Sequence, residues 1–210
     1  MRDDGNFVIE LPGGDWHGRV GVKNHPEIRF APGALEGGAV WDAGVLQLTV
    51  GGTLVVRGDG GTGKLEYYVL DARERFVCSL YTPVPPLRSE LLAPGDYLLL
   101  GHSEGLAAQA MPFTIRPGNE TELVVPRQPG VRQWIEFVVA AGTDPPPWVE
   151  FDVRRDATLL ASLSVGKSLR RALWLAPGSY TLTTRNRAPK ATVTFTVGST
   201  EGPPLRVALR

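Results

Sequence analysis

Three tryptophans in the second half of the chain, Trp134, Trp148 and Trp174, are the side chains best suited to bind another molecule. Each is out of phase with the apolar residues beside it, and successive residues of a strand face opposite sides of a sheet. We therefore expect the three rings to point away from the protein core. Exposed aromatic rings stack on sugars or anchor a protein partner. The alternative is that they pack at joints between domains or under the prolines of residues 145–147.

Groups that could support catalysis or bind a metal are few. His17, His25 and His102 are the only histidines, and none pairs with another at the short spacing of metal ligands on one element. Cys78 is the single cysteine and lies in an apolar run, which favours a small buried side chain over a nucleophile. No nucleophile and base are arranged in a known motif. We predict that the protein is not an enzyme and has no cofactor or metal.

The glycine-rich segment 58–64 nearly matches the phosphate-binding pattern Gly-x4-Gly-Lys-Ser/Thr, but Leu65 replaces the hydroxyl residue. The residues that follow alternate like a strand, whereas a phosphate loop must open a helix to present its amides. We therefore expect a turn between two strands at this segment.

The charge balance narrows the choice of partners. The chain has 22 Lys and Arg against 22 Asp and Glu, and nucleic-acid binders need an excess of cations to neutralise phosphates. No apolar run approaches the ~20 residues that cross a bilayer. We expect neither a nucleic-acid partner nor a membrane-spanning segment. Asp3 and Asp4 stand where a signal peptide would turn apolar, so none is expected. The compartment stays open, and would be extracytoplasmic if the chain is a piece of a larger exported protein.

The elements that would position these side chains are strands. Segments 134–139, 149–154 and 191–197 alternate apolar and polar residues with a period of two, which is typical of half-buried strands. Gly-Gly, Pro-Gly and Pro-Pro pairs lie between such segments. Short strands separated by turns at this spacing indicate an all-β sandwich or barrel.

An internal repeat sets the domain organisation. Leu92–Tyr97 reads Leu-Ala-Pro-Gly-Asp-Tyr and recurs 83 residues later as Leu175–Tyr180. A fainter copy, Leu11–Trp16, has a tryptophan in the tyrosine position. The same offset aligns Tyr68 with Phe151, so the repeat extends through a unit large enough for a seven-stranded sandwich.

We predict three domains with separate cores, joined in series. Residues 1–49 would be the C-terminal part of a first β-sandwich module that lacks its opening strands, residues 50–128 a second module, and residues 129–210 a third.

The turn in each repeat has a clear physical basis. Proline fixes φ, glycine takes a conformation open to it alone, and the tyrosine can bury its ring while its hydroxyl bonds the backbone. The residues that carry this motif are Trp16 in the first repeat, Pro94, Gly95 and Tyr97 in the second, and Pro177, Gly178 and Tyr180 in the third.

The order of strand, Leu-x-Pro-Gly-x-Tyr turn, strand and final hairpin resembles the carboxypeptidase regulatory-like domain family. Residues 4–7, Asp-Gly-Asn-Phe, are similar to that family's Asp-Gly-x-Phe turn. The resemblance implies tandem transthyretin-like or Ig-like β-sandwich modules, the first one incomplete. It also implies accessory folding or adhesion modules without catalytic residues.

Two functions follow as expectations. The first is a non-catalytic structural, adhesion or accessory module array, whose partners are other modules of a larger protein or a separate protein. The second is a carbohydrate-binding array, in which the three outward tryptophans contact a polysaccharide.

Overall fold

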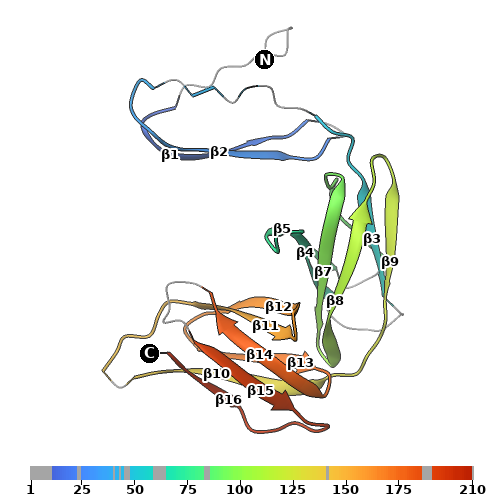
Figure 1. Cartoon of the computed structure of the whole chain (residues 1–210), viewed down its shortest axis with the longest axis vertical. Coiled ribbons are helices and arrows are strands. Elements are labelled where there is room, and N and C mark those ends of the chain that lie inside the picture. The colour runs from blue at the N-terminus through green and yellow to red at the C-terminus, as the bar shows by residue number, and fades with distance from the viewer. Residues whose placement is uncertain are drawn as a thin grey trace.

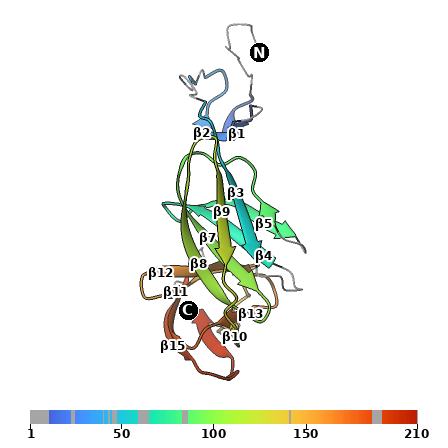
Figure 2. The ribbon, with the colours of Figure 1, turned by 90° about the vertical axis from the view of Figure 1, so that its right-hand side faces the viewer.

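The computed structural model describes residues 11–22, 25–39, 41–42, 44, 48–58, 65–82, 86–140, 142–185 and 191–209. Within these ranges the chain forms strands, turns and loops, with no helix. A β-hairpin and two β-sandwiches follow one another along the longest axis of the molecule (Figure 1; Figure 2). The protein is therefore all-β and built of tandem β-sandwich modules.

The middle sandwich contains β3 to β9. Its three-stranded sheet has the order β6-β3-β9, and its four-stranded sheet has the order β5-β4-β7-β8. The bounds are β3 (Thr53–Gly58), β4 (Leu65–Asp71), β5 (Phe76–Thr82), β6 (Leu87–Arg88), β7 (Gly95–Ser103), β8 (Leu106–Ile115) and β9 (Glu120–Val125). β3 and β9 pair in parallel and the other neighbours are antiparallel.

The C-terminal sandwich contains β10 to β16 and repeats this topology. Its sheets have the orders β13-β10-β16 and β12-β11-β14-β15, again with one parallel pair, β10 and β16. The bounds are β10 (Val131–Val139), β11 (Val149–Arg155), β12 (Thr158–Val165), β13 (Arg170–Leu175), β14 (Gly178–Thr184), β15 (Thr192–Val197) and β16 (Leu205–Leu209). The order of strands is thus the same in both sandwiches, as a tandem repeat requires.

Each sandwich has a core of its own between its two sheets. Leu54, Val69 and Leu99 are among the buried residues of the middle core, and Phe137, Phe151 and Leu182 of the C-terminal core. Strand β11 shows how the sequence achieves this, because its buried residues alternate strictly with more exposed ones. An alternating strand places one set of side chains inside and the other outside.

The predicted alignment of β4 is wrong by one residue. Tyr67 pairs with Leu80, as Phe151 pairs with Leu163, so Tyr67 and not Tyr68 is the equivalent of Phe151. The connection from Leu70 to its partner Phe76 is one residue longer than the equivalent connection from Arg154 to its partner Leu159. Because side chains alternate along a strand, this difference turns Tyr68 away from the core.

The N-terminal hairpin consists of β1 (Gly14–Val20) and β2 (Ile28–Leu35), which form a two-stranded antiparallel sheet. The end of the hairpin that carries the turn between β1 and β2 lies at the end of the middle sandwich (Figure 1). There the ring of Pro26 approaches Gly51 closely. The Asp-Gly-Asn-Phe segment of residues 4–7 lies outside the described residues.

Candidate functional site

The repeated turn forms the same corner three times. The hydroxyl of Tyr97 donates to the carbonyl of Ala93 at 2.7 Å, and that of Tyr180 donates to Ala176 at 2.5 Å. In the first repeat the indole Nε1 of Trp16 donates to the carbonyl of Pro12 at 2.8 Å. All three rings therefore bond the carbonyl four residues earlier, which is the structural role expected of the motif.

The glycines of the corners also share one conformation. Gly14, Gly95 and Gly178 have φ values of 150°, 153° and 152°. Residues with a Cβ rarely adopt a backbone φ in this range, so glycine is required at these positions. Tyr180 is 2% exposed and stacks on Phe195 across the strand, whereas Tyr97 is half-buried and stacks on Phe113.

Trp134 and Trp174 lie on the outer face of the three-stranded sheet of the C-terminal sandwich. They alternate with the buried residues of β10 and β13, as their phase in the sequence predicts. Trp174 is directly opposite Arg132 in the pairing of β10 with β13. The two rings are therefore neighbours on one surface.

Arginines cover these rings. The guanidinium carbon of Arg170 lies 4.2 Å from the ring centroid of Trp134. That of Arg132 lies 5.7 Å from Trp134 and 5.8 Å from Trp174. Arg132 is itself held by an ion pair with Glu201 at 2.8 Å, which raises its pKa. The result is a ladder of alternating aromatic and cationic groups, in which cation–π attraction holds the guanidinium groups over the rings.

Trp148 does not join this surface. It precedes β11, which belongs to the other sheet of the same sandwich, and it is 53% exposed. The three tryptophans proposed as contact residues thus divide into a pair on one sheet and a single ring beside the other.

The two sandwiches meet at a joint, where β7 and β8 of the middle sandwich contact β12 and β13 of the C-terminal one. We define the joint as Leu70, Leu100 and Leu159, which form a buried cluster of their own with Tyr68, Leu98 and Ala110 packed against it. Leu70 and Leu100 come from the outer face of the four-stranded sheet of the middle sandwich, and Leu159 comes from β12 of the C-terminal sandwich. The two cores are separate clusters, and a third apolar cluster connects them.

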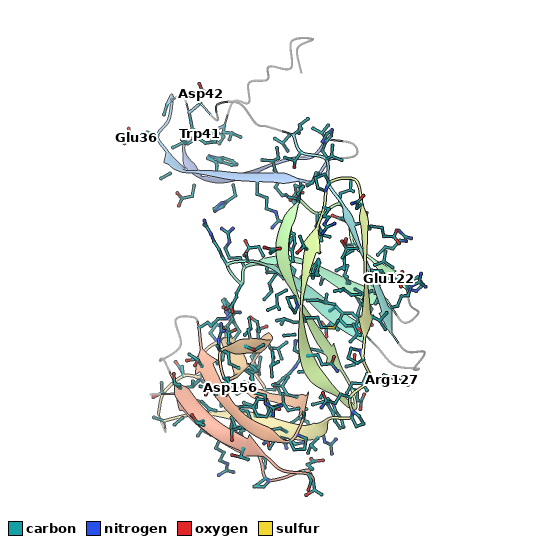
Figure 3. All side chains as sticks on the ribbon, turned by 45° about the vertical axis from the view of Figure 1, so that its right-hand side comes forward. Glu36, Trp41, Asp42, Glu122, Arg127 and Asp156 are labelled. Carbon is teal, nitrogen blue, oxygen red and sulfur yellow. The ribbon has the colours of Figure 1, made fainter. Side chains whose placement is uncertain are left out.

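Polar contacts flank the joint. The turn between β11 and β12, where Asp156 is labelled in Figure 3, lies beside the turn between β4 and β5, and Arg154 pairs with Glu74 across them. The link, residues 126–130 between β9 and β10, contains Arg127 (labelled in Figure 3) and is held by backbone hydrogen bonds. The Ala107 amide donates to Gln128 at 2.8 Å, and the Gly130 amide donates to Gly105 at 2.9 Å. The apolar cluster and the backbone hydrogen bonds of the link therefore both hold the two sandwiches together.

His102 is the one histidine beside the joint. Its Nε2 is shielded from solvent and has no hydrogen-bond partner, and its ring lies 5.7 Å from that of Tyr68. Burial lowers the pKa of His102 to about 4, with smaller opposing effects of Glu66 and Arg171. Burial, then the hydrogen bond that its hydroxyl donates to Glu66, raises the pKa of Tyr68 to about 12. Both side chains are therefore neutral near pH 7.

Nothing in the described residues gathers the ligands of a metal ion, since no group of three His, Cys, Asp or Glu side chains lies together there. Burial raises the pKa of the Cys78 thiol, which disfavours the reactive thiolate. Residues 59–64 of the glycine-rich segment lie outside the described part of the chain. Across the described residues, no helix has the length and apolar character needed to span a membrane.

No protein-family model matches the chain, and no curated protein matches its sequence. Among solved structures, the chain is similar to the TIE protein of Bacillus anthracis, with a TM-score of 0.34 and 14% identity over 96% of this chain and 40% of that one. A leucine-rich repeat protein from Bacteroides thetaiotaomicron gives a TM-score of 0.34 and 15% identity over 76% and 26% of the two chains.

A minor pilin of Streptococcus agalactiae gives a TM-score of 0.27 and 10% identity over 75% of this chain and 96% of that one. The chain spans less than half the length of the first two structures. Similarity this low carries no argument about function.

Proposed function

We propose that the chain is a non-catalytic structural array of β-sandwich modules that holds successive modules in a fixed orientation. The observation that carries this proposal is the joint, in which Leu159 of one sandwich is 2% exposed against Leu70 and Leu100 of the other. An apolar cluster that excludes water costs free energy to open, so the two sandwiches resist relative motion.

The backbone of the link supports the same proposal. A flexible linker would leave its amides to water, whereas the link here bonds the start of β8, and Gly130 approaches Ala107 too closely for a Cβ. A rigid series of small sandwiches suits an adhesion or accessory role, which the resemblance to carboxypeptidase regulatory-like domains also implies. Partners of such an array are other modules or a protein.

Carbohydrate binding by the three tryptophans is the weaker candidate. A sugar needs an open aromatic face, and guanidinium groups occupy the space over Trp134 and Trp174. Trp148 alone keeps more than half of its surface exposed. Titration with polysaccharides, followed by tryptophan fluorescence in the chain and in Trp148→Ala, would reveal such binding.

Small-angle X-ray scattering tests the proposed array. The profile of the two sandwiches should fit one fixed orientation, and Leu159→Ala should broaden the distribution of interatomic distances. Val138→Ala, at a 42% exposed position of the C-terminal sandwich, is the control and should leave the profile unchanged. A wild-type profile that requires many orientations of the two sandwiches would contradict the proposal.

A further inference from the structure

We infer that the edge of β1 opposite β2, which pairs with no other strand of the described residues, and the exposed ring of Phe76 on β5 form a docking surface for a partner β-hairpin of the β4–β5 type. The inference deepens the proposed array, on which it rests, by naming the partner that its N-terminal end accepts.

First, the N-terminal hairpin is equivalent to the β7–β8 hairpin of the middle sandwich. Gly14 pairs with Leu35 as Gly95 pairs with Ile115, and the corner residues follow in the same register. The shared glycine conformation and the corner hydrogen bond of Trp16 make the same assignment. β1 therefore takes the place of β7, and β2 the place of β8.

Second, this equivalence defines the strand that β1 accepts. In the sandwiches the far edge of β7 pairs with β4, and that of β14 pairs with β11, both antiparallel. Among the described residues β1 pairs with β2 alone, and none of the side chains described on either strand, which excludes those of residues 30–32, belongs to the buried core. An exposed edge offers unpaired amides and carbonyls to an added strand. The strand that fits is antiparallel and carries apolar residues at alternate positions, as β4 does with Tyr67 and Val69.

Third, the tip of the β1–β2 hairpin contacts the segment before β3, just as the tip of the β7–β8 hairpin contacts the link before β10. A Cβ on Gly130 would lie 2.7 Å from the Ala107 amide at the tip of β7–β8. At the N-terminal end, a Cβ on Gly51 would lie 2.8 Å from the ring of Pro26 at the tip of β1–β2. The two successive junctions are thus built alike, with a hairpin tip closed onto a linker glycine.

Fourth, Phe76 occupies the position that, in the C-terminal sandwich, is buried at the joint with the preceding sandwich. Phe76 pairs with Leu70 in the middle sandwich, as Leu159 pairs with Arg154 in the C-terminal one, so Phe76 is the equivalent of Leu159. Leu159 is 2% exposed because Leu70 and Leu100 of the preceding sandwich cover it, whereas Phe76 is 56% exposed. A β4–β5 hairpin added to β1 would bring a side chain in the place of Leu70 toward Phe76.

The occupant is a partner hairpin and not a second copy of this chain. In a second copy, β4 already pairs with β5 and β7 inside its own sandwich, and donating it would break a complete fold. A partner segment whose strands are still unpaired gains its ladder bonds only on docking.

The test uses the 210-residue chain and a synthetic peptide of residues 65–82 with Cys78→Ser, which is the β4–β5 hairpin itself. Binding should slow hydrogen exchange at the amides of Asp15 and Arg19 on β1. Phe76→Ala should weaken binding at least about tenfold, as expected for an aromatic anchor. The matched control is Tyr81→Ala. Tyr81 is 58% exposed, like Phe76, but its equivalent in the C-terminal sandwich, Ser164, is exposed and is not part of the joint. A shuffled peptide should not bind.

A second version fuses the hairpin before Met1 through a flexible linker, which raises its effective concentration. Unchanged exchange on β1 in this fusion would overturn the inference, as would equal effects of Phe76→Ala and Tyr81→Ala. Dimers of the chain without peptide, seen by light scattering, would replace the partner hairpin with a second copy. Neither result affects the X-ray scattering test of the joint, so the proposed array and the proposed partner hairpin can be disproved independently.

Discussion

At the scale of single residues, the corner motif is the part of the structure that the sequence predicts best. The motif predicts the position of the aromatic ring, of the glycine and of the turn. It also predicts that the ring donates a hydrogen bond to the backbone, as all three corners do. The outward direction of Trp134 also follows from its phase. Its cationic partner Arg132 can be predicted in the same way, because Arg132 is two residues away on the same strand and therefore on the same face.

Removing the hydroxyl of Tyr180 tests the corner. Tyr180→Phe leaves the buried carbonyl of Ala176 without its donor, so the C-terminal sandwich should lose about 1–2 kcal/mol of stability. Urea unfolding followed by tryptophan fluorescence measures this loss. Tyr97→Phe should cost less, because Tyr97 is half-buried and water can replace the lost bond. An unchanged midpoint in Tyr180→Phe would show that the bond contributes nothing.

His102 makes a prediction about pH. Burial lowers its pKa from 6.5 to about 4 in the folded protein, so the unfolded chain binds more protons between these values. Stability should therefore fall as the pH drops from 7.5 to 5, by about 1–2 kcal/mol when the partial exposure of the residue is allowed for. Chemical denaturation at the two pH values measures the difference. His102→Gln should remove most of it, and an equal difference in that variant would exclude His102 as the cause.

At the scale of elements, the sequence predicts the strands and their repeat but not their register. The connection from Leu70 to Phe76 is one residue longer than that from Arg154 to Leu159, and a shift of one residue exchanges the two faces of a strand. Tyr68 and Leu70, aligned with core residues by a fixed offset, consequently face the joint. Periodicity within a strand could not reveal this, because it depends on where the pairing between two strands begins.

The closure of the link tests how elements are connected. Gly130→Ala would place a Cβ 2.7 Å from the Ala107 amide and 2.9 Å from its Cα, so the link must move away from β8. We expect this variant to lose hydrogen-exchange protection at Ala107 and Gly130. Gly202→Ala is the matched control, because a Cβ there meets nothing within 4 Å. Equal protection in both variants would mean that the close approach is not needed.

At the scale of the whole molecule, the sequence predicts separate cores and the structure adds a cluster that connects them. Leu70, Leu100 and Leu159 are far apart in the sequence and on different sandwiches, so no local pattern marks them as neighbours. Coupling follows from this contact, because opening either sandwich uncovers apolar surface of the other. The molecule should therefore not behave as independent domains in series.

The chain itself carries a probe in each sandwich. Residues 50–128 contain no tryptophan and include the single cysteine, whereas residues 129–210 contain Trp134, Trp148 and Trp174. Labelling of the Cys78 thiol reports opening of the middle sandwich, and tryptophan fluorescence reports largely on the C-terminal one.

The most direct measurement is the labelling rate of Cys78 in Leu159→Ala under native conditions. We predict that this substitution in the C-terminal sandwich speeds labelling of Cys78 in the middle one by roughly tenfold, equivalent to about 1.4 kcal/mol of lost coupling. Leu209→Ala, in the C-terminal core and outside the joint cluster, should lower the fluorescence-detected stability without changing the labelling rate. An unchanged labelling rate in Leu159→Ala, beside a clear loss of stability in the C-terminal sandwich, would contradict the coupled array.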